Sequence, residues 1–331
     1  MNTTPDPTTN PGSGKPASTG HSPTADPAAI ESGPLGPAQR EEILRLVGAA
    51  AATDGVVPLS EQAMLHVRFG GQAADGDRED EAGPAGVDLL TAPDGVITGY
   101  AHLRWEEPGA ASAELVVDPA HRRRGAGRAL LAALAEQARG GSLRVWAHGD
   151  LPAAAGLARS AGLSRVRALF RMSRPLRDPL PEPSLPAGIT LRTFVPGRDE
   201  DAWLRLNALA FAHHPEQGAW TRVDLDLREQ EEWFDPAGFF LAERDGRLAG
   251  FHWTKVHDQD TGEVYVVGVD PAEQGSGLGR ALTLTGLRYL RDDRGLAVVM
   301  LYVDETNRAA VRMYTALGFT LAATDVMYGA G

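Results

Sequence analysis

Hydrophobic and polar positions along the second half of the chain alternate between the periods of strands and of helices. Apolar runs bounded by turn residues predict strands at 239–242, 248–256, 263–269 and 298–303. Asp245-Gly246, between the first two, is typical of a hairpin turn. Helices are predicted at 278–290, where leucines recur at helical spacing, and at 307–316, before Gly318. Strands that alternate with helices indicate an α/β sheet flanked by helices.

The first half of the chain repeats this order of elements. Asp94-Gly95 takes the place of the hairpin turn, and strands are predicted at 113–117 and 143–146 around a helix at 127–138. The first apolar positions with helical spacing begin at Ile43. Each half therefore has enough pattern to form an α/β unit of its own.

The two halves are related in sequence. The 14 residues of 117–130 and those of 269–282 agree at nine positions, with an offset of 152. Farther on, Ala161-Gly162-Leu163 corresponds to Leu317-Gly318-Phe319 at an offset of 156. Two matching blocks in the same order indicate a tandem repeat of one domain.

Two proline-rich segments divide the chain. Residues 1–37 carry 8 of the 23 prolines and no aromatic residue, so they cannot bury enough apolar surface to offset the entropy of ordering. We therefore expect a disordered tail there. Prolines recur over 175–187, where they oppose helix and central strand and predict an extended linker. The predicted domains are then 38–174 and 188–331.

Composition and charge exclude several classes of protein. The net charge of −12 disfavours non-specific binding of nucleic acid or of an anionic membrane. The absence of cysteine excludes a disulfide scaffold, a thiol nucleophile and a zinc–thiolate site. No apolar run reaches the roughly 18 residues of a membrane span. The start of the chain lacks the pattern of a signal peptide, so we expect a cytoplasmic protein. We also expect a monomer.

A glycine-rich loop stands between a strand and a helix in each half. The second half reads Gln274-x-x-Gly277-x-Gly279, and the first half reads Arg122-x-x-Gly125-x-Gly127. Glycines let backbone N–H groups approach an anion, and the N-terminus of the following helix adds partial positive charge. This arrangement suits a pyrophosphate. A Walker A lysine is absent, and the loop follows a late strand, unlike the loop of a dinucleotide fold.

The loop and the Val-Asp-Pro before it resemble motif A of the GCN5-related N-acetyltransferases (GNATs), and 307–314 followed by 317–319 resembles their motif B. The resemblance implies two tandem GNAT domains, each a mixed, mostly antiparallel central sheet flanked by helices. It implies acetyl-CoA as co-substrate, no metal, and a binding site formed by the loops, the strands before them and the start of the motif B helix. The residues so implied are Val267, Gly268, Val269, Gln274, Gly275, Ser276, Gly277, Leu278, Gly279, Arg280, Asn307, Arg308, Ala309, Ala310, Val311 and Arg312 in the second half, and Leu115, Val116, Val117, Arg123, Arg124, Gly125, Ala126, Gly127 and Arg128 in the first.

Three further phrases, at 54–62, 214–221 and 250–257, resemble the GNATs that complete mycothiol biosynthesis by acetylating the cysteinyl amine of cysteinyl-glucosaminyl-inositol. One residue among them also stands out by composition, because Lys255 and Lys15 are the chain's two lysines. The resemblance implies a set of substrate contacts from both halves. These are Glu61, Glu216, Lys255, Glu263 and Tyr302.

The repeat distinguishes the two halves chemically. Formation of an amide from a thioester needs a base for the amine and an acid for the departing thiolate. Glu263 corresponds to Ala111 in the first half, and Tyr314 corresponds to Ala158. We therefore expect the second half to be catalytic, with Glu263 as base and Tyr314 as acid. The first half is expected to bind acetyl-CoA without turning it over.

Other interpretations stay open at this point. The chain could acetylate another small amine or a peptide N-terminus, or it could be a non-catalytic acetyl-CoA-binding regulator. Glu263 could be a solvated carboxylate, and Tyr314 could pack a helix onto the sheet. His213-His214 beside Glu216 suggests a metal at first sight, but adjacent residues rarely converge on one ion. Arg122-Arg123-Arg124 is interpreted as a set of phosphate ligands, not as a nucleic-acid patch.

Overall fold

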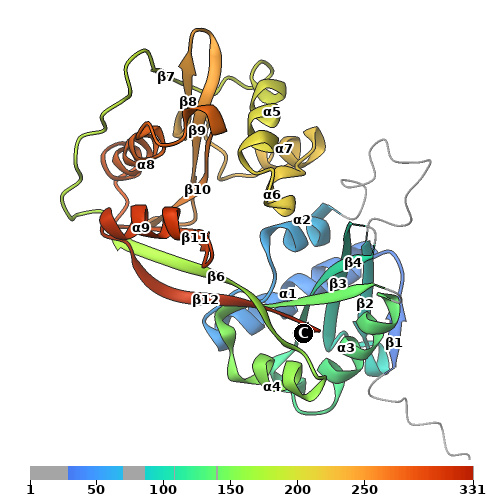
Figure 1. The fold of residues 1–331 in the computed structure, drawn as a ribbon. Coiled ribbons are helices and arrows are strands. Elements are labelled where there is room, and N and C mark those ends of the chain that lie inside the picture. Colours follow the sequence, from blue (N-terminus) through green and yellow to red (C-terminus); the bar gives the residue numbers. More distant parts are fainter. Residues whose placement is uncertain (1–28, 70–85, 108, 139–140, 331) are drawn as a thin grey trace, which may run out of the picture.

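Twelve strands form one sheet, in a computed structural model that describes residues 29–69, 86–107, 109–138 and 141–330. Their order is β1-β2-β3-β4-β5-β12-β6-β11-β10-β9-β8-β7 (Figure 1). Those of the first half are β1 (Ile30–Ser32), β2 (Gly86–Thr91), β3 (Gly99–Glu107), β4 (Ala110–Val117), β5 (Ser142–Ala147) and β6 (Ser164–Pro175). Those of the second half are β7 (Thr190–Thr193), β8 (Phe239–Arg244), β9 (Arg247–Val256), β10 (Thr261–Val269), β11 (Val298–Asp304) and β12 (Thr320–Gly329).

Helices pack on both parts of this sheet. In the first half they are α1 (Pro37–Asp54), α2 (Glu61–Phe69), α3 (Ala126–Gln137) and α4 (Pro152–Ser160). In the second half they are α5 (Glu200–Ala210), α6 (Pro215–Gly218), α7 (Arg222–Glu229), α8 (Leu278–Arg288) and α9 (Arg308–Ala316). α3 packs on β2, β3 and β4, and α8 packs on β8, β9 and β10 in the same way. The expected α/β class, and the strands and helices predicted in each half, are confirmed.

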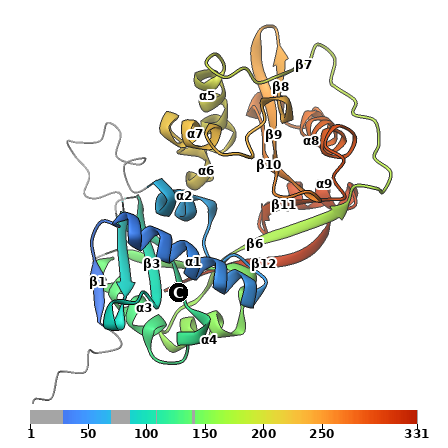
Figure 2. The same ribbon diagram turned by 180° about the vertical axis from the view of Figure 1, so that it is seen from behind.

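The two halves exchange a strand at the centre of the sheet. β6 of the first half lies between β12 and β11, and β12 of the second half lies between β5 and β6 (Figures 1 and 2). In the β6–β12 ladder, Leu169 faces Asp325, and these positions differ by the repeat offset of 156. The neighbouring pairs are Ala168 with Val326 and Phe170 with Thr324. The same offset relates Ala168 to Thr324 and Phe170 to Val326, so it exchanges one pair for the other. The sheet therefore has a pseudo-two-fold axis between Leu169 and Asp325.

Each half opens its sheet between two parallel strands. β10 and β11 are paired only over Thr261–Val264 of β10, although both strands continue beyond this segment. β4 and β5 are likewise paired only over Ala110–Ala113 of β4. Past these segments the facing backbones are no longer joined to each other by hydrogen bonds. An opening of the sheet thus lies beside each glycine loop.

Part of the segment predicted as a disordered tail is a strand. β1 pairs antiparallel with β2, with Ile30 opposite Thr91, and Ile30 packs against the core of the first half. The hydrogen bonds to β2 and the packing of Ile30 offset the entropy lost when this segment is ordered. Neither contribution can be inferred from the composition of the segment. The rest of the expected tail, up to residue 28, lies outside the described residues.

The proline-rich segment 175–187 connects β6 to β7 and forms neither helix nor strand after its first residue. It runs along the outer side of the second half (Figure 1). Leu176 and Leu180 are buried in a core cluster with residues of α8 and β11, so this connection is packed onto the domain that it precedes. Among the described residues, no helix is both long and apolar enough to cross a membrane.

The cores of the two halves differ at one corresponding position. In the second half, Phe239 and Trp253 face each other across β8 and β9 with stacked rings 4.5 Å apart. At an offset of 151, which relates the two hairpin turns, the corresponding pair is Asp88 and His102 on β2 and β3. The first half thus has a polar pair, Asp88 and His102, where the second half has the stacked rings of Phe239 and Trp253.

Candidate functional site

A cleft of about 1300 Å³ lies between the halves and is lined by residues of both. Figures 1 and 2 show α2 of the first half below α6 and α7 of the second. Four of the five expected substrate contacts line this cleft: Glu61, Lys255, Glu263 and Tyr302. The fifth, Glu216, lies in α6, and its side chain is outside the described part of the structure.

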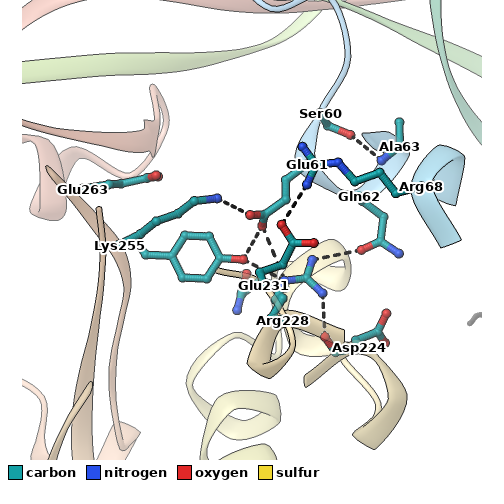
Figure 3. Close-up of polar contacts among 12 residues, drawn as sticks. Ser60, Glu61, Gln62, Ala63, Arg68, Asp224, Arg228, Glu231, Lys255 and Glu263 are labelled. Carbon is teal, nitrogen blue, oxygen red and sulfur yellow. Dashed lines mark hydrogen bonds and ion pairs between the residues drawn. The ribbon is translucent and has the colours of Figure 1, made fainter. Parts of the chain in front are cut away.

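Glu61 and Lys255 meet across the cleft. Glu61 begins α2, and its carboxylate accepts hydrogen bonds from the Lys255 ammonium and from the Tyr265 hydroxyl (Figure 3). The Lys255 Nζ also lies 4.3 Å from the centroid of the Trp233 ring. Burial would raise the pKa of Glu61, but the charges of Lys255 and Arg228 outweigh it and lower that pKa. Two expected substrate contacts, one from each half, are thus partners of each other.

Arg228 is a residue of this site that the sequence did not single out. Its side chain is buried, lies 3.8 Å from the centroid of the Trp220 ring and donates a 2.7 Å hydrogen bond to the Tyr265 hydroxyl. It donates another, of 3.0 Å, to Gln62 of the first half. Charged residues alternate along α7, which is the pattern of an exposed helix. The only indication in the sequence was Trp220, shortly before α7, because a guanidinium can stack on an aromatic ring.

Glu263 is buried beside Lys255. The two residues are direct cross-strand partners on β10 and β9, so their side chains share one face of the sheet. Glu263 is only 6% exposed, and its Oε2 lies 2.7 Å from His257 Nε2. Figure 3 shows Glu263 and Lys255 extending toward the cleft from neighbouring strands. A buried carboxylate with a histidine partner can accept a proton and pass it on.

A β-bulge follows Glu263. The pairing of β10 with β9 shifts between Val264 and Val266, so that Tyr265 is the extra residue. The first half has no shift at the corresponding place, where His102 pairs with Glu114 and Leu103 with Ala113 in regular register. Bulges re-aim side chains and leave ladder groups unpaired, and they are frequent beside active sites. This one turns Tyr265 toward Glu61, and nothing in the hydrophobic pattern predicts it.

Tyr314 lies deeper, in a smaller cavity of about 420 Å³ that shares Tyr265 and Tyr302 with the main cleft. Its side chain is 8% exposed, and its ring meets the edge of Phe319 at 5.7 Å. Burial raises the pKa of Tyr314 to about 12, so the phenol holds its proton at neutral pH. A protonated phenol at the wall of a cavity can act as an acid.

The glycine loop of the second half has the geometry of an anion cradle. Gly275 and Gly277 have φ values of 80° and 90°, which only glycine adopts without strain, and Gly277 caps α8. Val267–Val269 end β10 directly before this loop. The first N–H groups of α8 have no partner within the helix, so they can bind an anion. Asn307 caps α9 by accepting a 3.1 Å hydrogen bond from the Ala310 N–H.

The loop of the first half is built alike, with one strained residue. Gly125 caps α3 with φ of 100°, and Arg123 has φ of 66°. Arg123 corresponds to Gly275 at the repeat offset of 152. The expected phosphate ligand Arg122 is instead paired with Asp54 of α1 through hydrogen bonds of 2.7 and 2.6 Å. Arg123, Arg124 and Arg128 remain exposed at this loop.

Within the described part of the chain, one group of side chains has the arrangement of a metal site. His66, Asp88 and His102 place their ligand atoms within 4.8 Å of one another. Asp88 lies 2.9 Å from His66 and 3.0 Å from His102, and it accepts a 2.8 Å hydrogen bond from Tyr100. Burial would raise the pKa of Asp88, but the hydrogen bonds and charges of His102 and His66 outweigh it and hold the pKa well below its usual range. The three side chains satisfy one another in the first half, and His102 also lines the smaller cavity that Tyr314 lines.

Comparison with known proteins matches both repeats. The sequence model of the acetyltransferase (GNAT) family matches residues 63–163 and 203–319. A curated mycothiol acetyltransferase of Thermomonospora curvata is 62% identical, over 88% of this chain and 93% of its own length. Those of Thermobispora bispora and Acidothermus cellulolyticus are 58% and 50% identical, over 88% and 93% of this chain and 96% and 97% of their own lengths.

Solved structures have the same two-repeat fold. A tandem GNAT protein from the clavulanic acid biosynthesis pathway superposes with a TM-score of 0.67 over 92% of this chain and 99% of its own, at 23% identity. A GCN5-related N-acetyltransferase from Sphaerobacter thermophilus gives a TM-score of 0.62 over 91% of this chain and 95% of its own, at 26% identity. The predicted arrangement of two tandem domains with mixed sheets is confirmed.

Proposed function

Because the chain belongs to the acetyltransferase (GNAT) family and, within it, to the mycothiol acetyltransferases, we propose that it acetylates the cysteinyl amine of cysteinyl-glucosaminyl-inositol with acetyl-CoA. It is an N-acetyltransferase of mycothiol biosynthesis. The observation that carries the proposal is the cleft between the halves, where Glu61 and Lys255 meet above the buried Glu263. Such a cleft offers charged and hydrogen-bonding groups to a substrate rich in hydroxyls.

In the proposed reaction, the amine nitrogen attacks the thioester carbon and the carbon–sulfur bond breaks. Glu263 removes the proton that the amine loses, directly or through a water molecule, because its carboxylate is the buried acceptor at the cleft. Tyr314 donates its phenolic proton to the departing thiolate of coenzyme A. The backbone N–H groups beside the bulge at Tyr265 polarise the thioester carbonyl.

Catalysis is assigned to the second half because three features occur there and not at the corresponding positions of the first. Glu263 corresponds to Ala111 and Tyr314 to Ala158, and the bulge of β10 has no counterpart in β4. The first half keeps a glycine loop at the N-terminus of α3 and the opening between β4 and β5. We therefore infer that the first half binds acetyl-CoA without turnover and contributes Glu61 to the substrate-binding site.

Acetyl-CoA in the second half is assigned to the opening between β10 and β11. Its pyrophosphate would meet the loop of Gln274–Gly277 and the first turn of α8, and its thioester would lie along the unpaired end of β10. In the first half the corresponding groups are Leu115–Val117, the loop around Gly125 and the exposed Arg123 and Arg124. A cytoplasmic location, a monomeric state and the absence of a metal stay predictions.

Mass spectrometry of the protein incubated with acetyl-CoA and cysteinyl-glucosaminyl-inositol tests the substrate. We expect a product one acetyl group heavier, with the acetyl on nitrogen and the thiol free. A thiol-reactive dye would be misleading, since the substrate carries a thiol of its own. Bound acetyl-CoA without this product, together with acetylation of other amines, would contradict the substrate assignment and keep the acetyltransferase.

Substitution of Glu263 distinguishes an acetyltransferase from a protein that only binds acetyl-CoA. Glu263→Gln should lower kcat by roughly 10²- to 10⁴-fold, the usual contribution of a general base, and leave the affinity for acetyl-CoA unchanged. The matched control is Glu305→Gln, which removes an exposed carboxylate that pairs with Arg165. Equal turnover in the Glu263 variant and the control would overturn the assignment of the base.

A further inference from the structure

The segment that delivers Glu61 to the cleft is held from the first half by a carboxylate that is largely shielded from solvent. Ser60, the residue before Glu61, donates its backbone N–H to Oε2 of Glu114 at 2.5 Å. α2 begins at Glu61, so this hydrogen bond fixes the start of the helix on which Glu61 stands. Glu114 lies on β4, and its side chain is 12% exposed.

Glu114 is the end of a row of charges that reaches the second half. His148 Nε2 lies 3.6 Å from Glu114 Oε2, and His148 Nδ1 lies 3.0 Å from Asp325 Oδ2 on the exchanged strand β12. Asp325 also accepts a 2.7 Å hydrogen bond from the Gly149 N–H. We call Glu114, His148 and Asp325 the charged triad.

The members of the charged triad stabilise one another. Burial opposes protonation of His148, but its two carboxylate partners outweigh this effect and raise the pKa of His148 to about 10. Burial would raise the pKa of Glu114, but the nearby His148 and the hydrogen bond from the Ser60 N–H outweigh it and lower that pKa. At neutral pH the triad therefore holds a cation between two anions.

The shared fold does not require these charges. Glu114 corresponds to Val266 at the offset of 152, and both residues are the partners of corresponding positions on the neighbouring strand. Asp325 corresponds to Leu169 at the offset of 156. Burying three charges costs desolvation that an apolar substitution would avoid. The counterparts of Glu114 and Asp325 are apolar, and the charges contact the segment before Glu61 through Glu114, which points to a role in that segment.

We propose that Glu114, His148 and Asp325 are positioning residues that hold Ser60 and thereby aim the Glu61 carboxylate at Lys255 and the substrate. The inference rests on the proposed role of Glu61 as a substrate contact. Glu114 and His148 also line the smaller cavity, so direct contact with a ligand is the competing explanation. The two explanations differ in whether Glu114 acts through Glu61.

Hydrogen exchange of the Ser60 amide in the full chain tests the hold on the segment without reference to the substrate. We expect exchange to be at least roughly tenfold faster in Glu114→Ala, as for loss of a hydrogen bond to a charged group. Glu114→Gln keeps an acceptor and should show a smaller change, and it serves if the alanine variant fails to fold. The matched control is Glu42→Ala, because Glu42 accepts a 2.9 Å hydrogen bond from the Ile97 N–H in the same half. Unchanged exchange of Ser60 in both Glu114 variants would overturn the proposal.

Steady-state kinetics then test the connection to the substrate. Glu114→Ala should raise KM for the amine roughly tenfold, with kcat and KM for acetyl-CoA within about twofold of the parent and of Glu42→Ala. In a Glu61→Ala background, the same substitution should raise KM no further. An equal rise in that background would overturn positioning in favour of direct contact. Faster exchange of Ser60 with an unchanged KM would support the hold on the segment and contradict the proposed contact of Glu61 with the substrate.

Discussion

Lys255 of the second half and Glu61 of the first form an ion pair across the cleft. The pair joins the strand beside Glu263 to the first turn of α2. The ion pair therefore fixes both side chains in the cleft in the absence of substrate. We expect a substrate that enters the cleft to replace part of this ion pair with contacts from its own hydroxyl and amine groups.

Removal of Lys255 should weaken substrate binding more than it slows the chemical step. Lys255→Met keeps the length of the side chain and removes the ammonium, leaving Glu61 with Tyr265 and Arg228. We expect KM for the amine to rise by roughly tenfold or more, the value of a hydrogen bond to a charged group. Lys255→Arg should not restore it fully, because a planar guanidinium is larger and hydrated differently. Full activity of Lys255→Met would rule out a substrate contact.

Tyr314→Phe tests the acid. The substitution removes one hydroxyl from a buried ring and should lower kcat roughly 10²-fold or more, with little change in KM. Because burial raises the pKa of Tyr314 to about 12, its proton is retained below that pH. The rate of acetyl transfer is thus expected to show no loss from Tyr314 ionisation between about pH 7 and about pH 10. Tyr328→Phe, which removes a 3.0 Å hydrogen bond to Asp150, is the control and should keep kcat.

Arg123→Gly should stabilise the folded chain. A left-handed φ of 66° costs a non-glycine residue about 1 kcal/mol, partly offset in the variant by the greater freedom of glycine in the unfolded state. We expect a small gain in the free energy of unfolding, measured with urea, and weaker coenzyme A binding by the first half. Gly275→Arg is the reciprocal variant. A Cβ at this position would meet no heavy atom within 4 Å, so we expect stability to fall only by the conformational cost of an arginine at positive φ. A loss of stability in Arg123→Gly would show that its contacts outweigh the strain.

Asp88 should make the first half sensitive to acid. Its pKa is lowered in the folded protein, so its stabilisation is present above the unfolded value near 3.9 and is lost as the pH falls toward the folded value. We expect the free energy of unfolding to fall more steeply below about pH 5 in the parent than in Asp88→Asn. Asp201→Asn, at a side chain that is 75% exposed, should follow the parent. Parallel curves for the parent and Asp88→Asn would contradict the lowered pKa.

The elements that local pattern specifies were predicted, and those that depend on distant partners were not. The hairpin at Asp245-Gly246 and the helix that begins at Leu278 follow from turn chemistry and leucine spacing within a few residues. The repeat offset identified Glu263 and Tyr314 as differences between the halves. Pairing of Leu169 with Asp325 joins positions far apart along the chain, and no period in the sequence encodes it.

The residues of the candidate site also include some that were predicted and some that were not. Glu61, Lys255, Glu263 and Tyr302 were implied by resemblance, and the structure brings them to one cleft. Arg228 was missed because an arginine on a charged helix has the pattern of a solvated side chain, and only the tertiary fold stacks it on Trp220. The bulge at Tyr265 was missed because one extra residue in a strand leaves its apolar composition unchanged.

The exchange of β6 and β12 also has a consequence for biosynthesis. β5 of the first half pairs with β4 on one side, and its neighbour on the other side is β12, which follows every other described strand in the chain. A ribosome that has completed the first half has therefore not yet made the strand that covers this edge. Unpaired edges recruit other chains, so the nascent first half needs protection until translation passes Thr320–Gly329. Folding of the two halves is then coupled by the order of synthesis, and neither is expected to reach its native sheet when expressed alone.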